Sequence, residues 1–153
     1  MAPGKAVVAL SSGNGSTPFG VITLTPLAPA LFTWNSDNLA AAVAVCVSSS
    51  GAQTAEYPYR LVSSTLQSQT LHLGACAETV RELYGTGLDN AAAVQVSIGP
   101  AAATVLYAGA QGTWPGLDGI NVVIPQSLAG SGTVPVVVSA GGMTSNTVNI
   151  TVQ

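Results

Sequence analysis

Charged side chains are nearly missing from this sequence. Only 6% of the 153 residues are Asp, Glu, Lys or Arg, whereas a typical soluble domain has about 25%. Three basic residues cannot form the cluster of Lys and Arg that phosphate binding needs, so the composition excludes a nucleic-acid partner. Disorder is excluded as well, because disordered chains combine high charge with low hydrophobicity, and 48% of this chain is hydrophobic.

Long apolar runs and a set of catalytic side chains are also lacking. The nearest candidate for a membrane span, Leu39 to Val47, is well short of the ~18 residues required, so we expect no membrane span. His72 is the only histidine, and no Gly-x-Ser-x-Gly motif supplies a nucleophile for it. We therefore expect neither an enzyme nor a bound cofactor.

What the sequence does contain is alternation of apolar residues with small or polar ones. This alternation predicts half-buried antiparallel strands separated by Gly and Pro. We therefore expect an all-β, Ig-like antiparallel β-sandwich of about nine to eleven short strands. The alternating apolar positions towards the C-terminus are Val94, Val96, Ile98, Val105, Tyr107, Ile120, Val122, Ile124, Val134, Val136, Val138, Val148, Ile150 and Val152.

Shorter strands are predicted upstream of this region. Residues 39–48 predict a strand buried on both faces, and Leu31, Phe32 and Trp34 are expected to close one end of the core. Three further strands are predicted over residues 57–61, 70–73 and 79–84.

The first residues of the chain predict a hairpin that resembles the last one. Gly4–Leu24 overlays Gly132–Val152 without gaps at a constant offset of 128, and the apolar positions keep the same parity. An isolated hairpin is marginal in water, so its apolar face needs a partner. Both hairpins can pack into one enlarged sandwich, which is the arrangement we favour from the sequence. Alternatively, the first hairpin pairs with an exposed sheet edge of a neighbouring copy.

Cys46 and Cys76 are the only two cysteines. An even pair in a β-rich chain with few charges favours a disulfide bond. The alternative is two buried free thiols, because free cysteine often behaves as a small core residue.

A family resemblance rests on four motifs and on their order along the chain. They are Tyr84-Gly85-Thr86-Gly87, Val105-Leu106-Tyr107-Ala108-Gly109, Pro115-Gly116-Leu117-Asp118-Gly119-Ile120-Asn121-Val122 and Ser145-Asn146-Thr147-Val148. Together they resemble an uncharacterised domain at the C-terminal ends of large secreted bacterial proteins, which in turn is similar to the Ig-like IPT/TIG sandwiches. The resemblance implies an extracellular or cell-surface bacterial setting and no particular activity. It also implies that residues 1–26 are the closing hairpin of a preceding repeat and that residues 27–153 form an Ig-like sandwich domain.

Two loops carry candidate calcium ligands. Asp89, Asn90 and Asp118 lie in Gly-rich loops, and calcium takes about six or more oxygen ligands. The alternative, which we favour, is that these side chains cap their own turns.

Four aromatic residues are candidates for ligand binding. Trp114 lies between Gly112 and Pro115 in a predicted exposed loop, and Tyr107, Tyr57 and Tyr59 could extend the same platform. The alternative is that Trp114 packs over the end of the sandwich.

These observations favour a non-catalytic extracellular structural or assembly module, acting as a spacer, a display domain or a filament subunit. Its expected partners are other Ig-like domains, or copies of itself, through sheet edges. The alternative is a carbohydrate-binding module in which exposed aromatic residues contact a glycan.

Overall fold

The fold is all-β with antiparallel sheets, as the sequence predicts. The computed structural model describes residues 2–15, 17–35, 37–89 and 91–153, and within them fourteen strands and two short 3-10 helices occur. The strands are β1 (Gly4–Ala9), β2 (Phe19–Leu24), β3 (Ala30–Leu31), β4 (Ala42–Val47), β5 (Gln53–Glu56), β6 (Tyr59–Val62), β7 (Thr65–Ser68), β8 (Glu78–Thr86), β9 (Val94–Ile98), β10 (Ala101–Ala110), β11 (Asp118–Val123), β12 (Gly132–Ala140), β13 (Met143–Thr144) and β14 (Val148–Val152). The helices are η1 (Leu73–Ala75) and η2 (Gln126–Leu128), and neither is long enough to cross a membrane.

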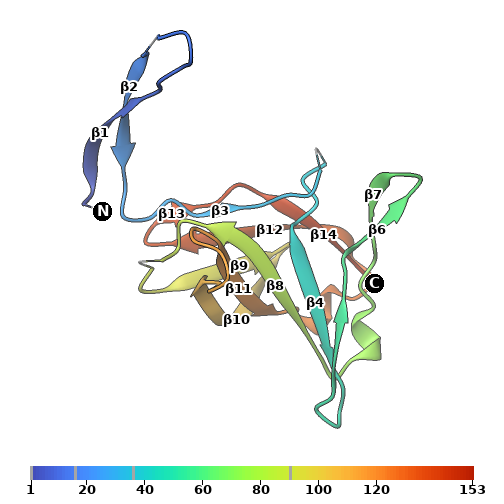
Figure 1. Ribbon diagram of the computed structural model, residues 1–153. Coiled ribbons are helices and arrows are strands. Elements are labelled where there is room, and N and C mark those ends of the chain that lie inside the picture. Colours follow the sequence, from blue (N-terminus) through green and yellow to red (C-terminus); the bar gives the residue numbers. More distant parts are fainter. Residues whose placement is uncertain (1, 16, 36, 90) are drawn as a thin grey trace.

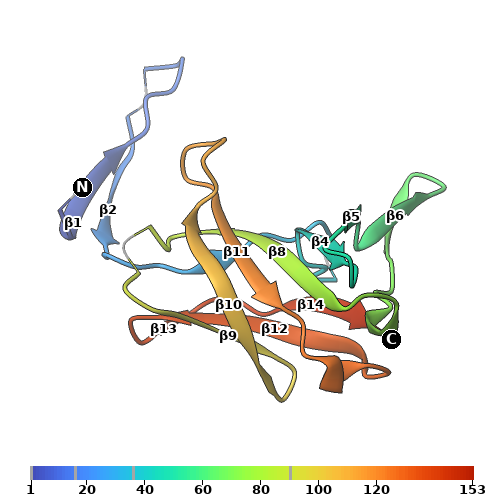
Figure 2. The same ribbon diagram turned by 90° about the horizontal axis from the view of Figure 1, so that it is seen from below.

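The main sheet runs in the order β13-β12-β9-β10-β11-β8-β4-β5, with β14 added to β12 and β3 added to β8. β10 is the strand at which the sheet turns from one layer to the other. Its residues 101–103 pair with β9, and its residues 104–110 pair with β11. Figure 2 shows the result, in which β9, β12 and β14 lie in one layer and β4, β8 and β11 lie in the other.

The core between the layers is aliphatic. Alternate residues of each strand point inwards, so Val136, Val138 and Ile150 are fully buried while their sequence neighbours are not. Each such side chain contributes about 1.5–3 kcal/mol when it is fully removed from water. The period of two that predicts the strands is therefore also the period of burial.

Three stretches differ from the expected strands. The stretch 57–61 is interrupted because Pro58 cannot donate to a ladder, so β5 ends at Glu56 and β6 begins at Tyr59. Residues 70–73 do not form a strand; Leu71 makes one isolated bridge to Val152, and the chain then turns into η1. β4 is shorter than predicted, with one face buried and the other half-buried. The strands outnumber the prediction because short strands such as β3, β7 and β13 were not predicted as separate elements.

The segment that leads into the sandwich is fixed by β8 and by the turn before β14. The backbone N–H of Ala28 donates to the carbonyl of Gly87, at 3.2 Å between nitrogen and oxygen. Gly87 has a φ of +83°, and a side chain there would collide with the Ala28 carbonyl. Further along, the Asn146 side-chain amide bonds both the N–H and the carbonyl of Leu31, at 2.8 and 3.0 Å.

The end of the core is closed differently from the expectation. Leu31 is buried, but Phe32 and Trp34 remain exposed. The prediction that these two aromatic side chains close the core is therefore wrong, because the structure places both on the surface.

The N-terminal hairpin β1–β2 forms a sheet of its own and stands away from the sandwich (Figure 1). Its pairing repeats that of β12–β14: Gly4 faces Leu24 as Gly132 faces Val152. The favoured arrangement, with both hairpins packed into one sandwich, is therefore not the one observed. The apolar side chains that stay exposed on the two strands of the hairpin and on the loop between them are Val7, Val8, Leu10, Phe19, Val21 and Ile22.

Candidate functional site

An aromatic cleft of about 460 Å³ lies over one layer of the sandwich. Trp114, which is 68% exposed, lines this cleft from the loop between β10 and β11. Facing it are Phe32 and Trp34, from the segment after β3, and Tyr84 from β8. Of the four aromatic residues predicted to bind a ligand, Trp114 alone lines the cleft. We refer to this feature below as the aromatic cleft.

Tyr57 and Tyr59 continue the aromatic surface beyond the cleft. The ring centroids of Trp34 and Tyr59 are 4.9 Å apart, and those of Tyr59 and Tyr57 are 5.8 Å apart. Tyr107, in contrast, does not belong to this group, because its hydroxyl donates to the Ala110 carbonyl at 2.5 Å. The structure thus joins three of the four predicted aromatic residues into one surface and separates the fourth.

Tyr84 gives the cleft a polar group. Burial raises the pKa of the Tyr84 hydroxyl, and the adjacent Glu82 carboxylate, which accepts a hydrogen bond from it, raises the pKa further. The neutral phenol is therefore the form present around neutral pH. Tyr84 thus brings one hydroxyl to the lining of the cleft, and Glu82, which is not itself a lining residue, accepts a hydrogen bond from it.

The Trp114 loop is an ordered turn. The N–H of Gln111 donates to the Leu117 carbonyl at 2.8 Å, and the N–H of Leu117 donates to the Trp114 carbonyl at 3.1 Å. The side-chain oxygen of Gln111 accepts from the N–H of Thr113 at 3.1 Å. These bonds fix the backbone of the loop from which Trp114 lines the cleft.

The two cysteines are bonded to each other, so the predicted disulfide is confirmed. Cys46 on β4 and Cys76 after η1 are 30 residues apart in sequence and 5.4 Å apart at their Cα atoms. The Glu56 carboxylate lies within 4.8 Å of both sulfur atoms. Because both sulfurs are used in the disulfide, this trio cannot act as a metal site in the oxidised chain.

Two of the three candidate calcium ligands are neighbours. The carboxylate of Asp118 is buried and accepts from the N–H of Leu88 at 2.7 Å. Burial raises the pKa of Asp118, the Leu88 N–H lowers it, and the adjacent Asp89 carboxyl raises it again. Asn90 lies outside the described residues. Calcium binding, the less favoured of the two interpretations, stays a prediction, and Asp118 caps the turn at Leu88 rather than its own turn.

His72 is the last of the titratable candidates. His72 is exposed, just before η1, and shares a shallow polar hollow with Arg60, Ser68 and Gln69. No carboxylate lines that hollow among the described residues.

Arg81 is the residue that sequence reasoning missed. Its side chain points from β8 into the core, is 0% exposed and has no hydrogen-bond partner for any nitrogen among the described residues. Burial lowers the pKa of Arg81 to about 9. The available signal was parity, because Arg81 shares the inward face of β8 with Thr79 and Leu83.

Comparison of the chain with family models, with curated proteins and with solved structures gives no match. A function must therefore be argued from the geometry of the chain itself.

Proposed function

We propose that this chain is a non-catalytic structural module of an extracellular or cell-surface bacterial assembly. In this assembly, the hairpin β1–β2 of one copy adds to an open sheet edge of the next copy. The observation that carries the proposal is the contrast between two hairpins of the same register, of which the chain buries one and leaves the other bare. The likeness to IPT/TIG domains and the disulfide agree with a setting outside the cell.

The bare hairpin has the properties of a donor. Ile22 is 45% exposed, whereas Ile150, at the equivalent position of β14, is 0% exposed. Val8 is 41% exposed, whereas Val136 on β12 is 0% exposed. β2 carries no charged residue, and the outer edge of the hairpin offers backbone N–H and carbonyl groups to another strand.

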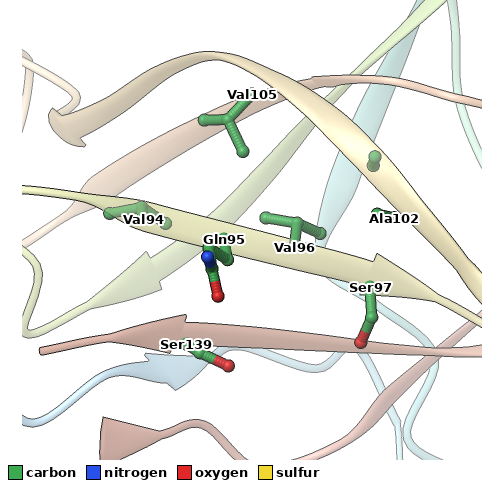
Figure 3. A pocket seen from close by; sticks show the side chains of 8 residues that line it. Val94, Gln95, Val96, Ser97, Ala102, Val105 and Ser139 are labelled. Carbon is green, nitrogen blue, oxygen red and sulfur yellow. The ribbon is translucent and has the colours of Figure 1, made fainter. Parts of the chain in front are cut away.

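The best acceptor is the side of β10 that faces away from β11. Residues 104–110 have no strand partner on that side among the described residues, because β9 pairs only with residues 101–103. Figure 3 shows β10 diverging from β9, with Val105 on the far side of the opening. A groove of about 500 Å³ lies there, lined by Val94, Val96 and Ala103 among others.

The composition of this edge favours strand addition. Natural sheet edges are protected by charged residues, above all Lys, or by Pro. β10 has neither, and no charged residue occurs between Asp89 and Asp118. The bulge between Val105 and Tyr107 is the only protective feature that this edge shows in the described residues. Donor and acceptor are also of similar length, since β2 has six residues and the open part of β10 runs from 104 to 110.

Association of this kind is head-to-tail, because the two surfaces differ, and a head-to-tail contact that does not close grows into a filament. The test compares the full chain with a chain that starts at Leu27, by light scattering over a range of concentrations and by negative-stain microscopy. We expect the full chain to form oligomers whose size rises with concentration, and the shortened chain to remain monomeric with its sandwich intact.

Point variants separate donor from acceptor. Ile22→Lys on the hairpin and Leu106→Lys on β10 both place a charge on an exposed position and should abolish oligomers without lowering the melting temperature. Thr54→Lys, on the edge strand β5, is the matched control and should leave assembly unchanged. A full chain that stays monomeric at high concentration would contradict the proposal.

A further inference from the structure

The aromatic side chains of this protein are all outside its core. The chain has two Trp, four Tyr and two Phe, and none of these eight side chains is buried. Aromatic residues usually dominate the energetics of cores, since each can bury 150–250 Å². Here six of the eight instead form the aromatic cleft and its extension. They are Phe32, Trp34, Tyr57, Tyr59, Tyr84 and Trp114.

The charges at the cleft indicate what it does not bind. Among the residues that the structure describes, its lining contains no Lys or Arg, and Arg81 of β8 points into the core on the opposite side of the strand. Glu82 is the charged group closest to Tyr84 that the structure records. An anionic ligand therefore has no counter-charge there.

The backbone at the cleft indicates that an added peptide strand does not fit. β8, which forms its floor, pairs with β11 on one side and with β4 and β3 on the other. The residues after β3 are paired too, because Phe32 donates its N–H to the Tyr84 carbonyl and Trp34 donates to the Leu39 carbonyl. A ligand in the cleft must therefore bind through side chains.

The side chains combine ring faces with neutral hydrogen-bonding groups. Gln111, Thr113 and the hydroxyl of Tyr84 lie next to the rings of Trp34 and Trp114. Binding sites for small molecules commonly pair aromatic walls with a few such polar groups that fix orientation. A pyranose ring suits this arrangement, because its C–H face stacks on an aromatic ring while its hydroxyls bond amides and carboxylates.

We propose that the aromatic cleft binds a neutral oligosaccharide. Trp114 and Trp34 stack on successive sugar rings, and Gln111 and the Tyr84–Glu82 pair bond the hydroxyls. Tyr59 and Tyr57 extend the binding surface past the cleft, so a longer oligosaccharide binds more tightly than a disaccharide. This function is separate from assembly, since the cleft and the open edge of β10 share no lining residue.

The experiment titrates the full chain with cellohexaose, xylohexaose, chitohexaose and maltohexaose and follows tryptophan fluorescence and heat of binding. We expect at least one of the four to bind. The variants Trp114→Ala and Trp34→Ala should each weaken binding by about tenfold or more, as loss of a central ring contact does. Tyr107→Ala, which removes an exposed aromatic side chain outside the cleft, is the matched control and should bind like the parent chain.

Three results would overturn the proposal: no binding of any of the four sugars, binding that survives both tryptophan variants, or binding lost equally in Tyr107→Ala. Unchanged melting temperatures show that the tryptophan variants remain folded. The assembly variant Leu106→Lys should bind the sugar normally, so failure of assembly and failure of glycan binding are read separately.

Discussion

The two hairpins β1–β2 and β12–β14 share their register and the alternation of their apolar residues. The apolar side chains of β1–β2 are nevertheless exposed, whereas those of β12–β14 lie in the centre of the core. The difference shows which properties of a hairpin are local and which are not. Alternation and register arise from the strands and the turn between them. Burial depends on the presence of a second layer, and the chain supplies only one sandwich body for two closing hairpins.

The strongest way to break this comparison is to make the same substitution in both hairpins. Ile150→Ala should lower the free energy of unfolding of the sandwich by about 2–5 kcal/mol, because it leaves a cavity in a packed core. Ile22→Ala, at the equivalent position, should change it by less than about 0.5 kcal/mol, as an exposed site does. Urea unfolding of both variants, at a concentration low enough for the parent chain to be monomeric, measures the effect. Equal losses would mean that β1–β2 is buried in solution.

Removal of the disulfide tests whether the sandwich can be destabilised without affecting the hairpin β1–β2. Replacing Cys46 and Cys76 together by Ala should lower the free energy of unfolding by about 3–4 kcal/mol, since the bond closes a loop of 30 residues. Hydrogen exchange of β1 and β2 should not change. A reducing agent should reproduce the effect in the parent chain and have none in the variant. Two free thiols in the native protein by mass spectrometry would show that the bond is absent.

Asn146 tests how firmly the connection between the two regions is held. Asn146→Ala leaves the N–H and the carbonyl of Leu31 without their partner and should cost about 1–3 kcal/mol. Amides of residues 28–31 should then exchange faster than in the parent chain. Asn149→Ala is the control, because its exposed bond to the Asp37 carbonyl is long, at 3.3 Å. Similar effects in both variants would show that Asn146 has no special role.

The smallest expected effect is a dependence of the free energy of unfolding on pH. It arises from Arg81, which lies in the core of the sandwich and not in the hairpin. In the unfolded chain, Arg81 keeps its proton up to its ordinary, much higher pKa, whereas burial lowers the pKa of Arg81 in the folded chain to about 9. The unfolded state therefore binds more protons in this window, and stability rises with pH. Between pH 8 and pH 10, the free energy of unfolding should increase by about 1 kcal/mol.

Arg81→Met removes the pH signature and should also stabilise the fold, because it replaces an unpaired buried cation with an apolar side chain. Glu78→Gln, at an exposed position of the same strand, should keep the rise between pH 8 and pH 10. A parent chain whose stability falls over this range would contradict the buried position of Arg81.

The sequence predicts the strands well where one face of a sheet is buried. Alternate side chains then face the core and the solvent, so apolar residues recur at every second position. It predicts Val136, Val138 and Ile150 in the core for that reason. Prediction fails where the chain turns away from the sheet, as around His72, where a single bridge at Leu71 is followed by a 3-10 turn. Pro58 carried a usable signal, because proline interrupts a ladder.

The candidate site was harder to predict than the fold. Trp114 was found because a tryptophan between Gly112 and Pro115 suggests an exposed loop. Its partners Phe32 and Trp34 were assigned to the core. The strand before them has only two residues, so no alternation pattern indicates which way these side chains point. The cleft depends on contacts between distant segments, and neither periodicity nor local spacing records such contacts. Arg81 was missed because arginine is mostly exposed in folded proteins, so its residue type gave no reason to place it in the core.

The disulfide has a mechanical consequence if modules of this kind bear tension along a row. The segment before β3 leaves the sandwich at one end and Gln153 lies at the other, so a pull on both passes through the whole body (Figure 1). When the sandwich yields, the 30-residue loop between Cys46 and Cys76 stays closed. At about 3.3–3.6 Å per extended residue, the bond withholds roughly 100 Å of contour length. A module with the bond intact therefore lengthens by roughly 100 Å less on unfolding than a reduced one.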